Sequence, residues 1–109
     1  MNLFERRVLE AFAKRSDPRV PDLSLQIGSV VVSKREETGV GWFTDFVADY
    51  QPASRFTGAL TGISAGSAGS TAAVGFALFL TDGVIDCLEC FSYQPNYQSN
   101  QEQYLVFED

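Results

Sequence analysis

The sequence contains no histidine and only two cysteines. Histidine is the usual general base near neutral pH, so its absence excludes Ser-His-Asp and Cys-His nucleophilic arrangements. Two cysteines cannot supply the four ligands of a structural zinc site. Residues 56–81 carry no charge, but twelve of these 26 residues are Ser, Thr or Gly, which favours strands and a loop over a membrane helix. We therefore expect no enzymatic activity, no cofactor, no bound metal and no membrane span.

Basic residues are scarce after residue 36. Residues 37–109 hold one basic residue, Arg55, against nine acidic ones, whereas residues 1–36 hold seven basic and five acidic residues. An acidic surface repels phosphate backbones, so nucleic acid is not an expected ligand. The same charge speeds association with a basic protein. A net charge of −6 is also ordinary for the solubility of a small domain, and that interpretation stays open.

A length of 109 residues with 45% hydrophobic residues fits one globular domain, 1–109, with a core of its own. Near its start the chain carries charges at Glu5, Arg6 and Arg7 and no apolar segment of the secretory type. We therefore expect a cytoplasmic protein in which Cys87 and Cys90 stay reduced.

Residues 2–15 show the clearest helical pattern. Phe4, Val8 and Phe12 recur at the spacing of one helix face. Further on, three apolar residues alternate with polar ones and predict a strand: Leu23, Leu25 and Ile27. Gly28 and Ser29 are expected to form a bulge before the following valines, and residues 36–39 a turn with Gly39 at positive φ.

Residues 73–93 form the densest apolar part of the chain. They predict two strands joined by a tight turn at Asp82 and Gly83, with the first strand in the middle of a sheet. Alternating patterns predict further strands at residues 40–48, 55–63 and 104–107. Residues 64–71 are rich in glycine and serine and predict a flexible loop. The fold class is α+β: an N-terminal helix packed on a curved, mainly antiparallel sheet of five or six strands.

The spacing of Cys87 and Cys90 matches the C-x-x-C pattern of redox proteins. Such a pair normally lies at a helix N-terminus, which stabilises the thiolate. Here it lies within a strand pattern, where residues three apart face opposite sides. We interpret both cysteines as packing residues.

The segment G-F-A-L-F-L-T-D-G-V-I-D-C-L-E-C-F-S-Y at residues 75–93, with T-G-V-G-W-F-T-D-F at 38–46, resembles a class of small bacterial proteins. These share a hairpin of the form GF-x-LF-x-x-DG-x-I-x-x-LE-x-(Y/F)-x-Y. The matching residues are Gly75, Phe76, Leu78, Phe79, Asp82, Gly83, Ile85, Leu88, Glu89, Phe91 and Tyr93. Some acidic proteins of this type are immunity proteins that neutralise toxins of contact-dependent growth inhibition. The chain departs from the pattern at Cys90, where glycine is common, and in its continuation over residues 94–109.

The resemblance and the charge distribution together imply a non-enzymatic protein-binding domain, and more narrowly a toxin-neutralising immunity protein with a basic partner. The candidate partner-binding residues are acids and aromatics: Asp45, Asp49, Asp82, Asp86, Glu89, Trp42, Tyr93 and Tyr97. Two alternatives remain. One is a small-molecule-binding domain that uses the sheet and the loop at 64–71. The other is a homodimer in which the strand at 104–107 pairs with its twin.

Overall fold

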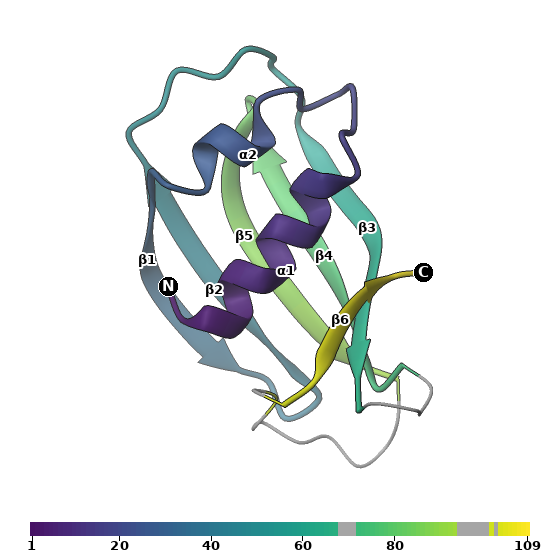
Figure 1. The fold of residues 1–109 in the computed structure, drawn as a ribbon. Coiled ribbons are helices and arrows are strands. Elements are labelled where there is room, and N and C mark those ends of the chain that lie inside the picture. The colour runs from purple at the N-terminus through teal and green to yellow at the C-terminus, as the bar shows by residue number, and fades with distance from the viewer. Residues whose placement is uncertain (68–71, 94–100, 102) are drawn as a thin grey trace.

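The computed structural model describes residues 1–67, 72–93, 101 and 103–109. Two helices and six strands follow one another along the chain: α1 (Leu3–Lys14), α2 (Leu23–Gln26), β1 (Val30–Glu37), β2 (Gly41–Ala48), β3 (Gly58–Gly66), β4 (Val74–Thr81), β5 (Val84–Ser92) and β6 (Leu105–Glu108). The strands form one antiparallel sheet in the order β1-β2-β5-β4-β3-β6. Both helices lie on the same side of this twisted sheet (Figure 1). The predicted α+β class is confirmed.

Helix α1 begins where the sequence predicts it. The side chain of Asn2 accepts a hydrogen bond from the backbone amide of Glu5, and the Glu5 side chain accepts one from the amide of Asn2. This reciprocal capping box satisfies two amides that the first helical turn leaves unpaired. The apolar side of α1 then lies on the sheet, with Val8 and Phe12 at most 1% exposed. In the part of the chain that the structure describes, no helix is long and apolar enough to cross a membrane.

The predicted strand at residues 23–27 is wrong, because the structure has the short helix α2 there. Leu23 and Ile27 are four residues apart, so both fall on one side of a helical turn and are buried. Leu25, the third member of the alternating set, is 69% exposed. The polar residue that the alternation places outside, Gln26, is fully buried. Leu23 and Ile27 fit both the two-residue period of a strand and the four-residue spacing of a helical turn. The burial of Gln26 and the exposure of Leu25 fit only the helix.

Strand β4 lies between β5 and β3, as predicted for the middle of the sheet. The turn to β5 uses Asp82 and Gly83 at φ 49° and 83°, the left-handed region that a type I′ hairpin requires. A Cβ atom on Gly83 would also lie 1.9 Å from the carbonyl oxygen of Ser54, so this position has no room for a side chain.

The loop predicted at residues 64–71 begins too early. Residues 64–66 continue β3, where Ser64 and Ala65 are at most 1% exposed and pair with β4 on one side and β6 on the other. Residues 68–71 lie outside the described part of the chain. Strand β6 is at the edge of the sheet, as predicted for residues 104–107.

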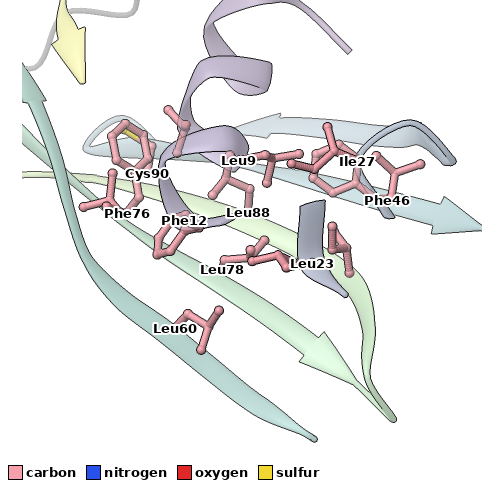
Figure 2. Packing of buried hydrophobic residues seen from close by; sticks show 14 of the residues in the cluster. Leu9, Phe12, Leu23, Ile27, Phe46, Leu60, Phe76, Leu78, Leu88 and Cys90 are labelled. Carbon is pink, nitrogen blue, oxygen red and sulfur yellow. The ribbon is translucent and has the colours of Figure 1, made fainter. Parts of the chain in front are cut away.

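The core lies between the two helices and the sheet. Figure 2 shows Leu9 and Phe12 of α1 and Leu23 of α2 facing Leu78 and Leu88 of the central strands. Each of these five side chains is at most 3% exposed. We call this covered side of the sheet the inner face and the opposite side the open face.

An irregularity in β1 changes which side chains reach the inner face. It lies between Val32 and Lys34, and not at Gly28 and Ser29 as predicted. Val32 pairs with Phe46, yet Arg35 pairs with Thr44, so the strand gains one residue relative to its partner. The extra residue turns Arg35 toward α1, where regular alternation from Val32 would have placed it on the open face.

Candidate functional site

The register of the strands determines the composition of the open face. Residues directly opposite one another in neighbouring strands project to the same side. One row across the sheet is therefore Lys34, Asp45, Cys87 and Phe79, and the next is Glu36, Phe43, Glu89 and Ala77. Neither described helix lies on this side (Figure 1). The open face is thus a sheet surface that carries aromatic and acidic side chains together.

Large apolar side chains are exposed on the open face at its centre and toward both ends. Phe79 is 36% exposed at the centre. The others that the register places on this face are 38–61% exposed: Val31, Val47, Tyr93, Leu105 and Phe107. Scattered exposed apolar residues are normal, but a contiguous apolar surface marks an interaction site.

Three carboxylates lie around the thiol of Cys87 on the open face. Asp45 is directly opposite Cys87 and forms a side-chain hydrogen bond with it, and the charges of Asp86 and Glu89 also act on the thiol. These carboxylates do not converge, since no three His, Cys, Asp or Glu side chains within the described ranges could jointly hold a metal ion. We call Asp45, Asp86 and Glu89 the open-face acids.

Both cysteines are poor nucleophiles. Burial, the hydrogen bond to Asp45 and the charges of the open-face acids raise the pKa of Cys87 to about 12. Burial and the charges of Glu37 and Glu89 raise the pKa of Cys90 to about 12, although a hydrogen bond with Gln101 opposes them. Cys90 faces the core and Cys87 the open face, so the two thiols lie on opposite sides of β5. This agrees with packing residues and not with a redox pair.

Thiol modification tests this interpretation. At pH 8 the folded chain should react with a maleimide at least about 100-fold more slowly than the urea-unfolded chain, because so little thiolate is present. The variants Cys87→Ser and Cys90→Ser report on each remaining thiol separately. A folded-state rate within tenfold of the unfolded rate for Cys87 would show that its thiolate is not suppressed.

The other predicted site residues are dispersed. Asp49 follows β2 and is exposed, and Asp82 is at the hairpin turn, where its amide donates to the hydroxyl of Thr57. Tyr93 is on the open face and its hydroxyl lies 3.2 Å from the Ser64 hydroxyl oxygen. Tyr97 lies outside the described residues. The structure therefore groups Asp45, Asp86, Glu89 and Tyr93 on one face and leaves Asp49 and Asp82 at its margins.

Trp42 lies on the inner face, so it is not an aromatic anchor of the open face. Its side chain is 9% exposed, and its indole Nε1 donates to Oε1 of Gln101 at 3.1 Å. Its neighbour Phe43 points to the open face, opposite Glu89. Both residues are aromatic, and the β2 sequence alone does not indicate which of them faces the helices.

A buried carboxylate that the sequence did not single out lies beneath the N-terminal end of α1. Glu5 is 2% exposed and accepts hydrogen bonds from the guanidinium of Arg35 at 2.7 and 3.0 Å and from the hydroxyl of Thr44 at 2.6 Å. A surface groove of about 1120 Å³ runs beside it and is also lined by Arg7 and Trp42. Because the polar groups at its base are paired with one another, we assign this cluster to holding α1 on the sheet.

The Glu5 cluster is expected to make stability depend on pH. Burial raises the pKa of Glu5, but the hydrogen bonds from Arg35, Thr44 and Asn2 outweigh burial and hold this pKa below the ordinary value of 4.5. A lowered folded-state pKa contributes stability above the unfolded-state value, and this contribution is lost as the pH falls through the folded-state pKa.

Replacing Arg35 by methionine should lower the free energy of unfolding at pH 7 by about 3 kcal/mol. This is the low end of the range for breaking a buried ion pair, because the Arg35 side chain is 49% exposed. In urea denaturation, the difference from wild type should shrink as the pH falls below the ordinary value of 4.5 and through the lowered folded-state pKa of Glu5. Lys34→Met, whose ion pair with Glu36 is exposed, should change stability by less than about 0.5 kcal/mol. A difference that is constant with pH would contradict this role of Glu5.

The residues that carry the family resemblance are mostly structural. A Cβ atom on Gly75 would lie 2.2 Å from the Tyr93 hydroxyl and 2.7 Å from the Phe91 ring, so both aromatic side chains cover this glycine. The two rings pack edge to face at 5.6 Å. Phe76 and Leu88 belong to the core. Of the matching residues, Phe79 and Glu89 are the two that project from the open face between the turn and this aromatic cover.

Comparison of the chain with protein-family models, with curated proteins and with solved structures gave no match. Within the described residues, the two candidate binding surfaces are the open face and the groove beside Glu5.

Proposed function

We propose that this chain is a non-enzymatic, cytoplasmic protein-binding domain that binds a basic protein partner through the open face. The observation that carries the proposal is the set of exposed apolar side chains on the open face, among which Phe79 lies beside the open-face acids. Apolar anchors surrounded by charge are the usual composition of a protein–protein interface. The net charge of −8 over residues 37–109 favours the binding of a positively charged partner.

The narrower proposal is that of an immunity protein, which neutralises the toxin of a contact-dependent growth inhibition system. It is supported by the resemblance of residues 38–46 and 75–93 to small bacterial proteins of that kind, and by the acidic open face. A gene for a large toxin next to the gene for this chain would be strong support.

Affinity capture from the native host tests the proposal. The tagged chain should retain a basic protein, identified by mass spectrometry, and release it as the salt concentration rises, because salt screens exposed charges. The matched control is the same bait with Asp45 and Glu89 both changed to lysine, which should retain much less of that protein. Recovery of no basic protein, or equal recovery by both baits, would count against the proposal.

The groove beside Glu5 supports a second candidate, the binding of a small molecule. A groove of about 1120 Å³ is large enough for a metabolite. A thermal-shift screen separates the two candidates, because a ligand raises the melting temperature by mass action. A ligand whose effect disappears in Arg7→Met, a change in the lining of the groove outside the Glu5 ion pair, would favour the second candidate.

A further inference from the structure

We infer that the open face binds arginine side chains of the partner, each stacked on Phe43 or Phe79 and paired with a neighbouring carboxylate. This inference rests on the proposed protein-binding function and adds the chemistry of the partner and the place where it docks. It follows from the positions of the aromatic rings relative to the acids, from the ion pairs of the described chain and from an arrangement that the chain itself contains.

Aromatic and acidic side chains alternate on the open face. Phe43 is directly opposite Glu89 and two residues from Asp45 in the same strand. Phe79 is directly opposite Cys87, which is itself directly opposite Asp45. Neighbouring strands lie about 4.8 Å apart, and residues two apart in a strand about 6.8 Å. A cation that stacks on either ring is therefore within reach of a carboxylate.

The open-face acids have no cation of their own. Among the described residues, no lysine or arginine forms an ion pair with Asp45, Asp86 or Glu89. Lys34 is directly opposite Asp45 in the sheet, but its ammonium lies 3.9 Å from the carboxylate of Glu36. Asp86 accepts a hydrogen bond from the Thr81 hydroxyl at 2.9 Å and Asp45 is hydrogen-bonded to Cys87, but neither contact neutralises the carboxylate, so a partner that supplies cations could still pair with it.

The described part of the chain contains the proposed arrangement within itself. The guanidinium of Arg19 lies 4.9 Å from the centre of the Phe56 ring, and the same guanidinium donates to Asp17 at 2.7 and 3.0 Å. Arginine suits this geometry better than lysine, because its planar guanidinium can stack on a ring and donate two parallel hydrogen bonds to a carboxylate. An incoming arginine at Phe43 or Phe79 would repeat these contacts between molecules.

A second copy of the chain does not satisfy the open face. Two open faces in contact would bring the acids Asp45, Asp86 and Glu89 of both copies together, and each copy carries a net charge of −6. Like charges in contact across an interface cost several kcal/mol. The charge distribution thus favours a basic partner over self-association.

The test uses the full isotope-labelled chain and three synthetic ten-residue peptides, in which leucine alternates with arginine, lysine or glutamate. In NMR titrations the Arg/Leu peptide should shift the amides of Phe43, Phe79 and Glu89 but not those of Leu9 and Phe12. It should bind at least threefold more tightly than the Lys/Leu peptide, and the Glu/Leu peptide should not bind. The variants Glu89→Gln and Phe79→Ser should each lower the affinity for the Arg/Leu peptide at least threefold. Glu10→Gln, on the outer side of α1, should leave that affinity unchanged.

Three results would overturn the inference. One is that the Arg/Leu peptide does not bind at 1 mM (about the weakest affinity of interest) or binds on the helix side. Another is equal binding of the Arg/Leu and Lys/Leu peptides. The third is a dimer in sedimentation that Phe79→Ser dissociates, which would show that a second copy covers the face. In each case a basic protein captured from the host would still support the proposed function, and failure of both experiments would reject both.

Discussion

Replacing Phe76 by aspartate is expected to abolish folding. The Phe76 ring is 1% exposed, and its centre lies 5.9 Å from that of Phe4 and 6.1 Å from that of Trp42. It therefore joins the interior strand β4 to helix α1. Truncating such a phenylalanine to alanine costs about 4 kcal/mol, and a buried unpaired carboxylate costs more. Because small domains keep about 5–15 kcal/mol of net stability, the aspartate variant should show no cooperative thermal transition.

The matched control is Phe79→Asp, three residues further along the same strand. Phe79 faces the opposite side and is 36% exposed, so a carboxylate there can reach water. This variant should keep a cooperative transition and a circular dichroism spectrum like that of wild type. Cooperative folding of Phe76→Asp, or loss of folding in Phe79→Asp, would mean that the two faces of β4 have been assigned incorrectly.

Replacing Gln26 by leucine is expected to have the second largest effect. The side chain of Gln26 is fully buried, its Nε2 donates to the carbonyl oxygen of Gly83 at 2.7 Å, and its Oε1 accepts from the amide of Ile85 at 3.0 Å. Leucine would leave both buried backbone groups without a partner. Each orphaned group costs about 1–3 kcal/mol, so urea denaturation should show a loss of about 4 kcal/mol.

Two further variants make this prediction specific. Ser24→Leu changes an exposed position of the same short helix and should alter stability by less than about 0.5 kcal/mol. In Gln26→Glu, a buried carboxylate would face the carbonyl oxygen of Gly83, which raises its folded-state pKa. Its protonated form can donate to that oxygen, so this variant should recover stability as the pH falls. A loss in Gln26→Leu below 1 kcal/mol would show that the hairpin does not depend on these hydrogen bonds.

The hairpin of β4 and β5 could be predicted from the sequence because several local signals agree there. Apolar residues fill β4 and alternate with polar ones in β5, and Asp82 and Gly83 are the residues that a tight turn with positive φ requires. The helix at the N-terminus was equally clear from the apolar stripe of Phe4, Val8 and Phe12, and the capping box of Asn2 and Glu5 agrees with it. Agreement of local and global preferences makes such segments predictable.

Other features depend on contacts between distant residues, which no local pattern contains. Gln26 is buried because two backbone groups of the hairpin, at Gly83 and Ile85, need partners. An extra residue in β1 after Val32 moves the following side chains to the opposite side of the sheet. Arg35 therefore lies on the inner face, where it contacts Glu5. A shift of one residue moves every following side chain to the other side of a sheet.

The candidate site was predictable in charge but not in its aromatic members. Asp45 and Glu89 share one face because of the register of β2 and β5, whereas Asp86 is the unpaired residue at an irregularity between β4 and β5 and lies beside Cys87. The sequence favoured Trp42 as an anchor, whereas the structure buries it and places Phe43 on the open face. Alternation separates two neighbouring aromatics onto opposite faces, but only the position of the helices decides which face is covered.

The most direct test of the binding surface compares two charge reversals of the same size. Glu89→Lys is on the open face, and Glu10→Lys is on the exposed side of α1, where Glu10 pairs with Arg6 at 2.9 Å. With the basic protein captured from the host, isothermal titration should show affinity about tenfold or more weaker for Glu89→Lys. Glu10→Lys should stay within about twofold of wild type. Equal weakening by both variants, or none by Glu89→Lys, would contradict the assignment of the open face as the binding surface.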